Sequence, residues 1–121
     1  MHFTAAAITV LTGLGIIYIG IQYVFAPLKS AQTFGLPTWP TQTGWLQLKG
    51  FRDIASGLVV LIPLALGEFQ VLGYLMLAAS VTPFGDMLTV LRHGGSRTAA
   101  YAIHGLTAVV VVIGGIAALL A

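Results

Sequence analysis

The sequence predicts an all-α integral membrane protein, a four-helix up-down bundle with a long first loop. Hydrophobic residues make up 58% of the 121 residues and charged residues 7%, whereas about 25% of the residues of globular proteins are charged. Four windows of about 20 mostly apolar residues follow one another, each long enough to cross a bilayer. Residues 1–121 leave room for a single transmembrane domain.

The first span is expected at residues 4–26, ending before Pro27. No Lys or Arg precedes it, and its apolar run exceeds the roughly 7 to 15 residues of a signal-peptide core. We therefore interpret it as a membrane span. The other spans are expected at residues 46–66, 69–91 and 98–121, with short turns at 67–68 and 92–96.

The connection at residues 27–44 is the only long one, and its three prolines and two glycines predict irregular structure. Its Trp39 and nearby Trp45 suit a membrane interface. The segment could be an interfacial lid or an ordered connector. Within the third span, Pro83 removes the hydrogen bond to the carbonyl of Ala79 and predicts a bend there.

Composition also excludes several functions. Five scattered basic residues are too few for a nucleic-acid interface. The absence of cysteine excludes disulfides, thiolate catalysis and thiolate metal sites. No HxxxH or ExxH spacing supports a metal site, so neither a metal nor another cofactor is expected.

Two of the three carboxylates, Asp53 and Asp86, lie inside predicted spans. An ionised side chain at the bilayer centre costs about 2.5 to 3.5 kcal/mol by insertion scales, so such residues usually serve a site. Antiparallel threading brings Asp53, Asp86 and His104 to similar depths of roughly 10 Å from the same end, at about 1.5 Å of rise per residue. We expect them to form one site.

Residues three and four apart share a helix face, so each span presents a polar stripe to this end of the bundle, above an apolar floor. The residues expected to be catalytic are Asp53, Asp86, Arg52 and His104. The residues expected to bind the substrate are Tyr18, Gln22, Lys49, Ser56, Thr82, Thr89, Tyr101 and Thr107.

Three stretches carry a family resemblance: LKGFRDIASG at 48–57, PFGDMLTVLRHGG at 83–95 and AIHGLTA at 102–108. With them the chain resembles a family of small four-helix integral membrane proteins of unknown function, and its layout is similar to DoxX-like proteins. Some fungal relatives of that family are described as epoxide hydrolases of polyketide pathways. The resemblance therefore implies ring-opening chemistry on lipophilic molecules.

Two carboxylates in a site of low dielectric do not both ionise easily, so one is expected to act as acid and one as base, with Arg52 bridging them. Such a pair suits opening of an epoxide-like ring, or a related isomerisation or cyclisation. Tyr18 or Tyr101 could donate a hydrogen bond to the substrate oxygen, and His104 could orient Asp86. The expected partners are a lipophilic small-molecule substrate and membrane lipid.

Two alternatives remain open. A proton-coupled carrier or channel would use the same residues as a relay, but the apolar half of the bundle offers almost no polar position unless a homodimer supplies a path between subunits. A structural membrane subunit would keep the charges as a buried ion-pair network, since such pairs can simply fix helix register. Its close helix contacts would use small residues such as Gly114 and Ala118.

Basic residues predict the orientation. Lys29, Lys49, Arg92 and Arg97 all lie at the polar end. Because Lys and Arg concentrate in cytoplasmic loops, this end is expected to be cytoplasmic and both termini non-cytoplasmic. In a bacterium the membrane would be the plasma (inner) membrane.

Overall fold

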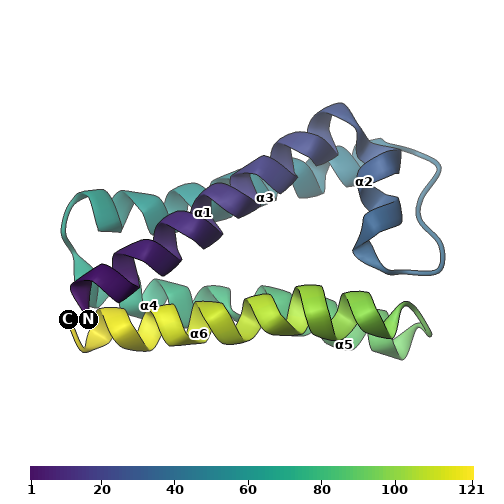
Figure 1. Ribbon diagram of the computed structural model, residues 1–121. Coiled ribbons are helices and arrows are strands. Elements are labelled where there is room, and N and C mark those ends of the chain that lie inside the picture. The colour runs from purple at the N-terminus through teal and green to yellow at the C-terminus, as the bar shows by residue number, and fades with distance from the viewer.

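The computed structural model describes residues 1–121 and is entirely helical, as predicted. Two layers of helices meet near the chain termini and separate toward the other end, where a short helix lies between them (Figure 1). The helices are α1 His2–Phe25, α2 Pro27–Phe34, α3 Gly44–Ala65, α4 Phe69–Ala79, α5 Val81–Arg92, the π-helical η1 Ala99–Gly105 and α6 Leu106–Leu119.

Three segments are long and apolar enough to cross a membrane: His2–Phe25, Phe69–Arg92 and Ala99–Leu119. They match the first, third and fourth predicted spans. The helix α3 has 22 residues but carries Lys49, Arg52 and Asp53, and it is not among the three. Large apolar side chains such as Leu11, Val81 and Leu120 are exposed on the outer surface, as in proteins surrounded by lipid.

Glycines let α1 and α3 pack along each other in the upper layer (Figure 1). A Cβ atom added to Gly20 would lie 2.5 Å from the carbonyl oxygen of Gly50, and one added to Gly50 would lie 2.6 Å from that of Gly20. The two backbones therefore approach as closely as backbones do at small-residue contacts between membrane helices.

The predicted irregular structure of residues 27–44 is wrong for its first half, which forms α2. Pro27 occupies the first turn of this helix, where no backbone N–H is needed. Gly35 ends the helix with φ of 110°, the left-handed conformation common at helix C-termini. The two later prolines, Pro37 and Pro40, lie beyond that end, in the irregular remainder.

The third predicted span is interrupted at Ser80, between α4 and α5, one turn before Pro83. The bend predicted at Pro83 stays a prediction, because Ser80 keeps right-handed helical angles (φ −62°, ψ −19°) and its amide donates to the carbonyl of Met76. The hydroxyl of Ser80 donates a 2.6 Å hydrogen bond to the carbonyl of Leu77 in the preceding turn.

The buried side chains form two clusters. Leu72, Met76 and Val60 belong to the cluster at the end of the termini. Tyr23, Ala31 and Leu46 form a smaller one at the other end, where α2 packs between the two layers. The helix α2 thus lies between the two layers where they are furthest apart, and it forms one wall of the cavity described next.

Candidate functional site

A cavity of about 270 Å³ lies between the end of α1, α2 with its following loop, the start of α3 and the middle of α5. Its walls are largely aromatic and aliphatic, and include Tyr23, Phe34 and Trp39. Lys49 and Asp86 also line it, from different helices. It is an apolar pocket with a few converging polar groups, the usual form of a small-molecule site.

Lys49 is fixed on one side of the cavity. Its Nζ lies 2.7 Å from Oδ2 of Asp53, one helical turn further along α3. It also lies 4.1 Å from the centre of the Tyr23 ring and 5.3 Å from that of Phe34. An ammonium group over aromatic faces is attracted by the ring quadrupoles. Lys49 is therefore held by a carboxylate and by rings from two other helices.

Asp53 is only 8% exposed and does not line the cavity. Its charge is matched by Lys49, which explains how a carboxylate is tolerated here. Asp53 is connected to the cavity only indirectly, through its ion pair with Lys49.

Asp86 faces His104 at the other side, with Oδ2 of Asp86 4.0 Å from Nδ1 of His104. The opposite ring nitrogen, Nε2, lies 2.7 Å from the carbonyl oxygen of Phe34. The His104 and Phe34 rings also pack together, with centroids 4.3 Å apart. His104 is thus held between the end of α2 and the carboxylate on α5.

The π-helical turn η1 carries His104. Such turns are wider than α-helical ones and are frequent at functional sites. Gly105, directly after the histidine, lets α5 approach, because a Cβ there would lie 2.9 Å from Sδ of Met87. These two features set the position of the imidazole relative to Asp86.

The charged groups form one electrostatic cluster. Lys49 pairs with Asp53 and lies over the Tyr23 ring, Asp86 faces His104, and Lys49 and Asp86 line the same cavity. The structure thus brings together Asp53, Asp86, Lys49 and His104, as the sequence predicted, and Thr89 lines the same cavity.

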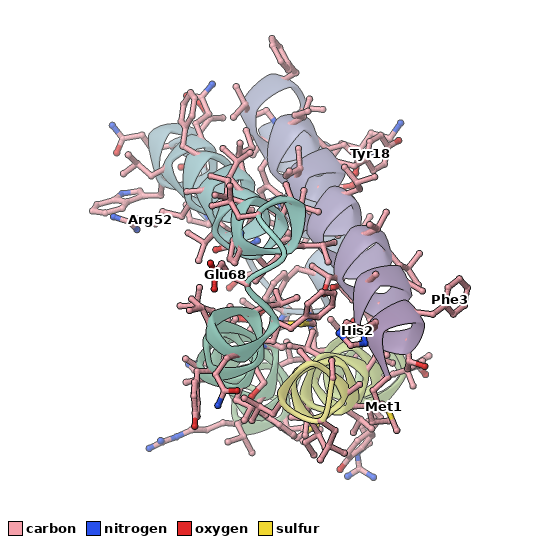
Figure 2. The ribbon with its side chains drawn as sticks, turned by 90° about the vertical axis from the view of Figure 1, so that its left-hand side faces the viewer. Met1, His2, Phe3, Tyr18, Arg52 and Glu68 are labelled. Atoms are coloured by element: carbon pink, nitrogen blue, oxygen red, sulfur yellow. The ribbon has the colours of Figure 1, made fainter.

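Arg52 does not take the predicted bridging position. It is exposed and points away from the helices on the outer side of α3 (Figure 2). Consecutive helical residues are about 100° apart, so a neighbour of the buried Asp53 faces elsewhere. Lys49, one turn before Asp53, pairs with Asp53 instead and lines the same cavity as Asp86.

The other predicted substrate-binding residues do not line the cavity. Tyr18 is 63% exposed on the outer side of α1 (Figure 2), where it accepts a 3.2 Å hydrogen bond from Gln22. The exposed Ser56 and Thr107 donate to backbone carbonyls of their own helices. Thr82 and Tyr101 are exposed as well. A polar stripe is wider than the face that a helix buries, so only part of each stripe faces inward.

Tyr23, Phe34 and Trp39 were not predicted as site residues. Tyr23 lies three residues after Gly20, on the same buried face of α1. That spacing is a signal that could have found it. Phe34 and Trp39 carry no such signal, because their positions depend on how α2 and the loop dock.

The arrangement can act on a molecule bound between two different polar groups. Lys49 supplies a proton and a positive charge, while Asp86 with His104 supplies a carboxylate that can accept a proton. The largely apolar walls lower the local dielectric and so strengthen both interactions.

Searches of the curated proteins and of the solved structures give no match to the chain. A family model described as Domain of unknown function (DUF4267) matches residues 13–119. The match includes every residue of the cavity and of its charged cluster. The chain therefore belongs to the DUF4267 family.

Proposed function

We propose that this protein is a small intramembrane acid-base enzyme acting on a lipophilic small molecule, and that its reaction is the hydrolytic opening of an epoxide-like ring or a related isomerisation or cyclisation. One observation carries the proposal. Lys49 and Asp86, from separate helices, line one cavity whose walls are otherwise largely apolar.

Epoxide opening needs attack at carbon together with protonation of the ring oxygen. Asp86 accepts a proton from water as the water oxygen forms a bond to a ring carbon. The carbon–oxygen bond breaks, its electron pair stays on the former ring oxygen, and the Lys49 ammonium protonates that oxygen. The product is a vicinal diol. A proton passing from Asp86 to Lys49 through water restores both groups.

Asp53 acts through Lys49, as a positioning residue. Its 2.7 Å ion pair and the Tyr23 and Phe34 rings hold the ammonium where the substrate oxygen would develop negative charge. Thr89 can hydrogen-bond to the bound molecule from α5. The reaction requires no cofactor.

The cavity also limits the substrate. A volume of about 270 Å³ is just below the roughly 300 to 1,000 Å³ of pockets for drug-sized ligands. Aromatic walls favour a flat or cyclic hydrocarbon body. The proposed substrate is therefore a compact ring compound with one reactive oxygen. The resemblance to fungal relatives described as epoxide hydrolases points in the same direction.

The membrane setting completes the proposal. Because α3 packs along α1, which can itself span a membrane, α3 would be the fourth span of an up-down bundle. Its Asp53 is buried and paired, and Arg52 can extend its charge toward the interface. The site end would be cytoplasmic and both termini non-cytoplasmic, and in a bacterium the membrane would be the plasma membrane.

The test uses the purified protein in detergent with styrene oxide, a flat aromatic epoxide, as the probe. We expect the wild type to form the diol, and Asp86→Asn and Lys49→Met to lose about 100-fold or more in kcat/KM, the scale of one acid or base group. Arg52→Gln is the matched control, since this exposed charge lies outside the cavity, and should retain activity.

Wild-type protein that neither binds nor turns over a panel of lipophilic epoxides would contradict the proposal. Proton flux in liposomes that disappears in Asp86→Asn would favour the carrier. Folded variants without any functional difference from the wild type would favour the structural subunit.

A further inference from the structure

His104 lies between two groups that determine which of its ring nitrogens carries the hydrogen. Its Nε2 is 2.7 Å from the backbone carbonyl oxygen of Phe34. A carbonyl oxygen can only accept a hydrogen bond, so Nε2 carries the hydrogen. In the neutral ring the other nitrogen, Nδ1, then has the lone pair, and Nδ1 is the atom that faces Asp86.

We propose that His104 takes the proton of Asp86 and passes it on to Lys49, and that the Phe34 carbonyl sets the tautomer which allows this. The inference rests on the proposed function, in which Asp86 gains a proton from water and must lose it before the next turnover. In place of direct transfer from Asp86 to Lys49 through water, the proton passes through the imidazole of His104.

The step balances. The O–H bond of protonated Asp86 breaks and an N–H bond forms at Nδ1, giving a carboxylate and an imidazolium. The imidazolium then releases this proton, through water, to the neutral amine of Lys49. The 4.0 Å between Oδ2 and Nδ1 is longer than a hydrogen bond. Transfer therefore requires a small rotation of the Asp86 side chain or one bridging water.

The surroundings leave few other partners. The charged groups in this cluster are Asp86 from α5 and Lys49 and Asp53 from α3. From α2, His104 meets the ring and carbonyl of Phe34. From α5, Met87 packs against the adjacent Gly105. Oδ2 of Asp86, 4.0 Å from Nδ1, is the charged group within reach of that nitrogen.

A second contact holds the Phe34 carbonyl in place. The amide of Ser96 donates a 2.8 Å hydrogen bond to the carbonyl of the next residue, Gly35. A Cβ on Gly35 would lie 2.6 Å from Cβ of Ala99 and would push the end of α2 away from η1. The end of α2 is thus anchored independently of His104.

Two substitutions of His104 distinguish the roles of its two ring nitrogens, because each places an amide nitrogen near one of them. The amide nitrogen of His104→Gln can take the position of Nε2 and keep the bond to Phe34, but no titrating group then faces Asp86. The amide of His104→Asn overlaps Nδ1 and loses the Phe34 contact. We expect His104→Gln to retain the melting temperature of the wild type with a 10- to 100-fold lower kcat and unchanged KM for styrene oxide. His104→Asn should lower both melting temperature and kcat. Full activity in a folded His104→Gln variant would overturn the inference.

The ¹⁵N signals of the imidazole provide a test that does not depend on turnover. The His104 signals are assigned by their absence in His104→Gln, and we expect hydrogen on Nε2 and a lone pair on Nδ1. Hydrogen on Nδ1 would overturn the inference even if the protein turned over epoxides. If no epoxide reacts, the proposed function fails, while these signals still show which ring nitrogen carries the hydrogen.

Discussion

Lys49 explains why a carboxylate is present in the interior of α3. Its ammonium group is paired with Asp53 and lies over the Tyr23 ring. Breaking a buried pair by removing one partner leaves the other charge uncompensated. The ion pair within α3 thus holds the Lys49 ammonium group at the cavity wall.

A stability prediction follows for this pair. Lys49→Met should lower the free energy of unfolding by about 2 kcal/mol, below the 3 to 5 kcal/mol of fully buried pairs, because Lys49 is partly exposed. Adding Asp53→Asn should recover most of the loss, since no buried charge then remains. Thermal unfolding in detergent measures both, with the exposed Lys29→Met as control. An Lys49→Met protein as stable as the wild type would contradict the importance of the pair.

The sequence predicted most of the ionisable residues that lie near the cavity, but only some of their neighbours. The prediction that Asp53, Asp86 and His104 lie close together used only their depth along antiparallel spans and no side-chain geometry. It placed Arg52 in the site too, because depth does not specify rotation about the helix axis. The hydrogen bond from His104 to Phe34 joins residues 70 positions apart, and no local pattern predicts such a contact.

At the scale of helices, hydropathy predicts long elements and fails for the short one. Residues 4–26, 69–91 and 98–121 correspond to segments that can span a membrane, because apolar length is a local property. The helix α2 was missed because prolines were counted without regard to position. Pro27 begins a helix, whereas Pro37 and Pro40 follow its end. The π-helical geometry of η1 depends on packing against α5 and has no signature in its own residues.

The contact between α1 and α3 gives a second stability prediction. Gly50→Val should destabilise the protein by about 1 to 3 kcal/mol, the range for overpacked cores, because the added atoms would meet the Gly20 carbonyl. Gly15→Ala is the control, since nothing lies within 4 Å of a Cβ there. Thermal unfolding compares the two variants. Equal melting temperatures would show that the two helices are not held at this close approach.

At the scale of the whole molecule, the charged site and the termini lie at opposite ends (Figure 1). The end near the termini is packed with Leu72, Met76 and Ala117. An apolar end of this kind offers almost no polar position, so transport through the protein would need a path between two subunits.

The chain has no cysteine, so single-cysteine variants give a clean test of topology. Thr41→Cys, in the exposed loop at the site end, should react with a membrane-impermeant maleimide only after the cytoplasmic side is exposed. Glu68→Cys, in the turn between α3 and α4, should react from outside intact cells. Labelling of both positions from one side would exclude α3 as a fourth span.

The central claim is that Lys49 and Asp86 act on one bound molecule, and a double-mutant cycle on kcat/KM for styrene oxide tests it most directly. Groups that serve the same transition state show strongly non-additive effects. With every variant measured at a temperature where it is folded, we expect Asp86→Asn combined with Lys49→Met to be about as slow as the slower single variant. Losses that multiply fully, or single variants with wild-type kcat/KM, would contradict the claim.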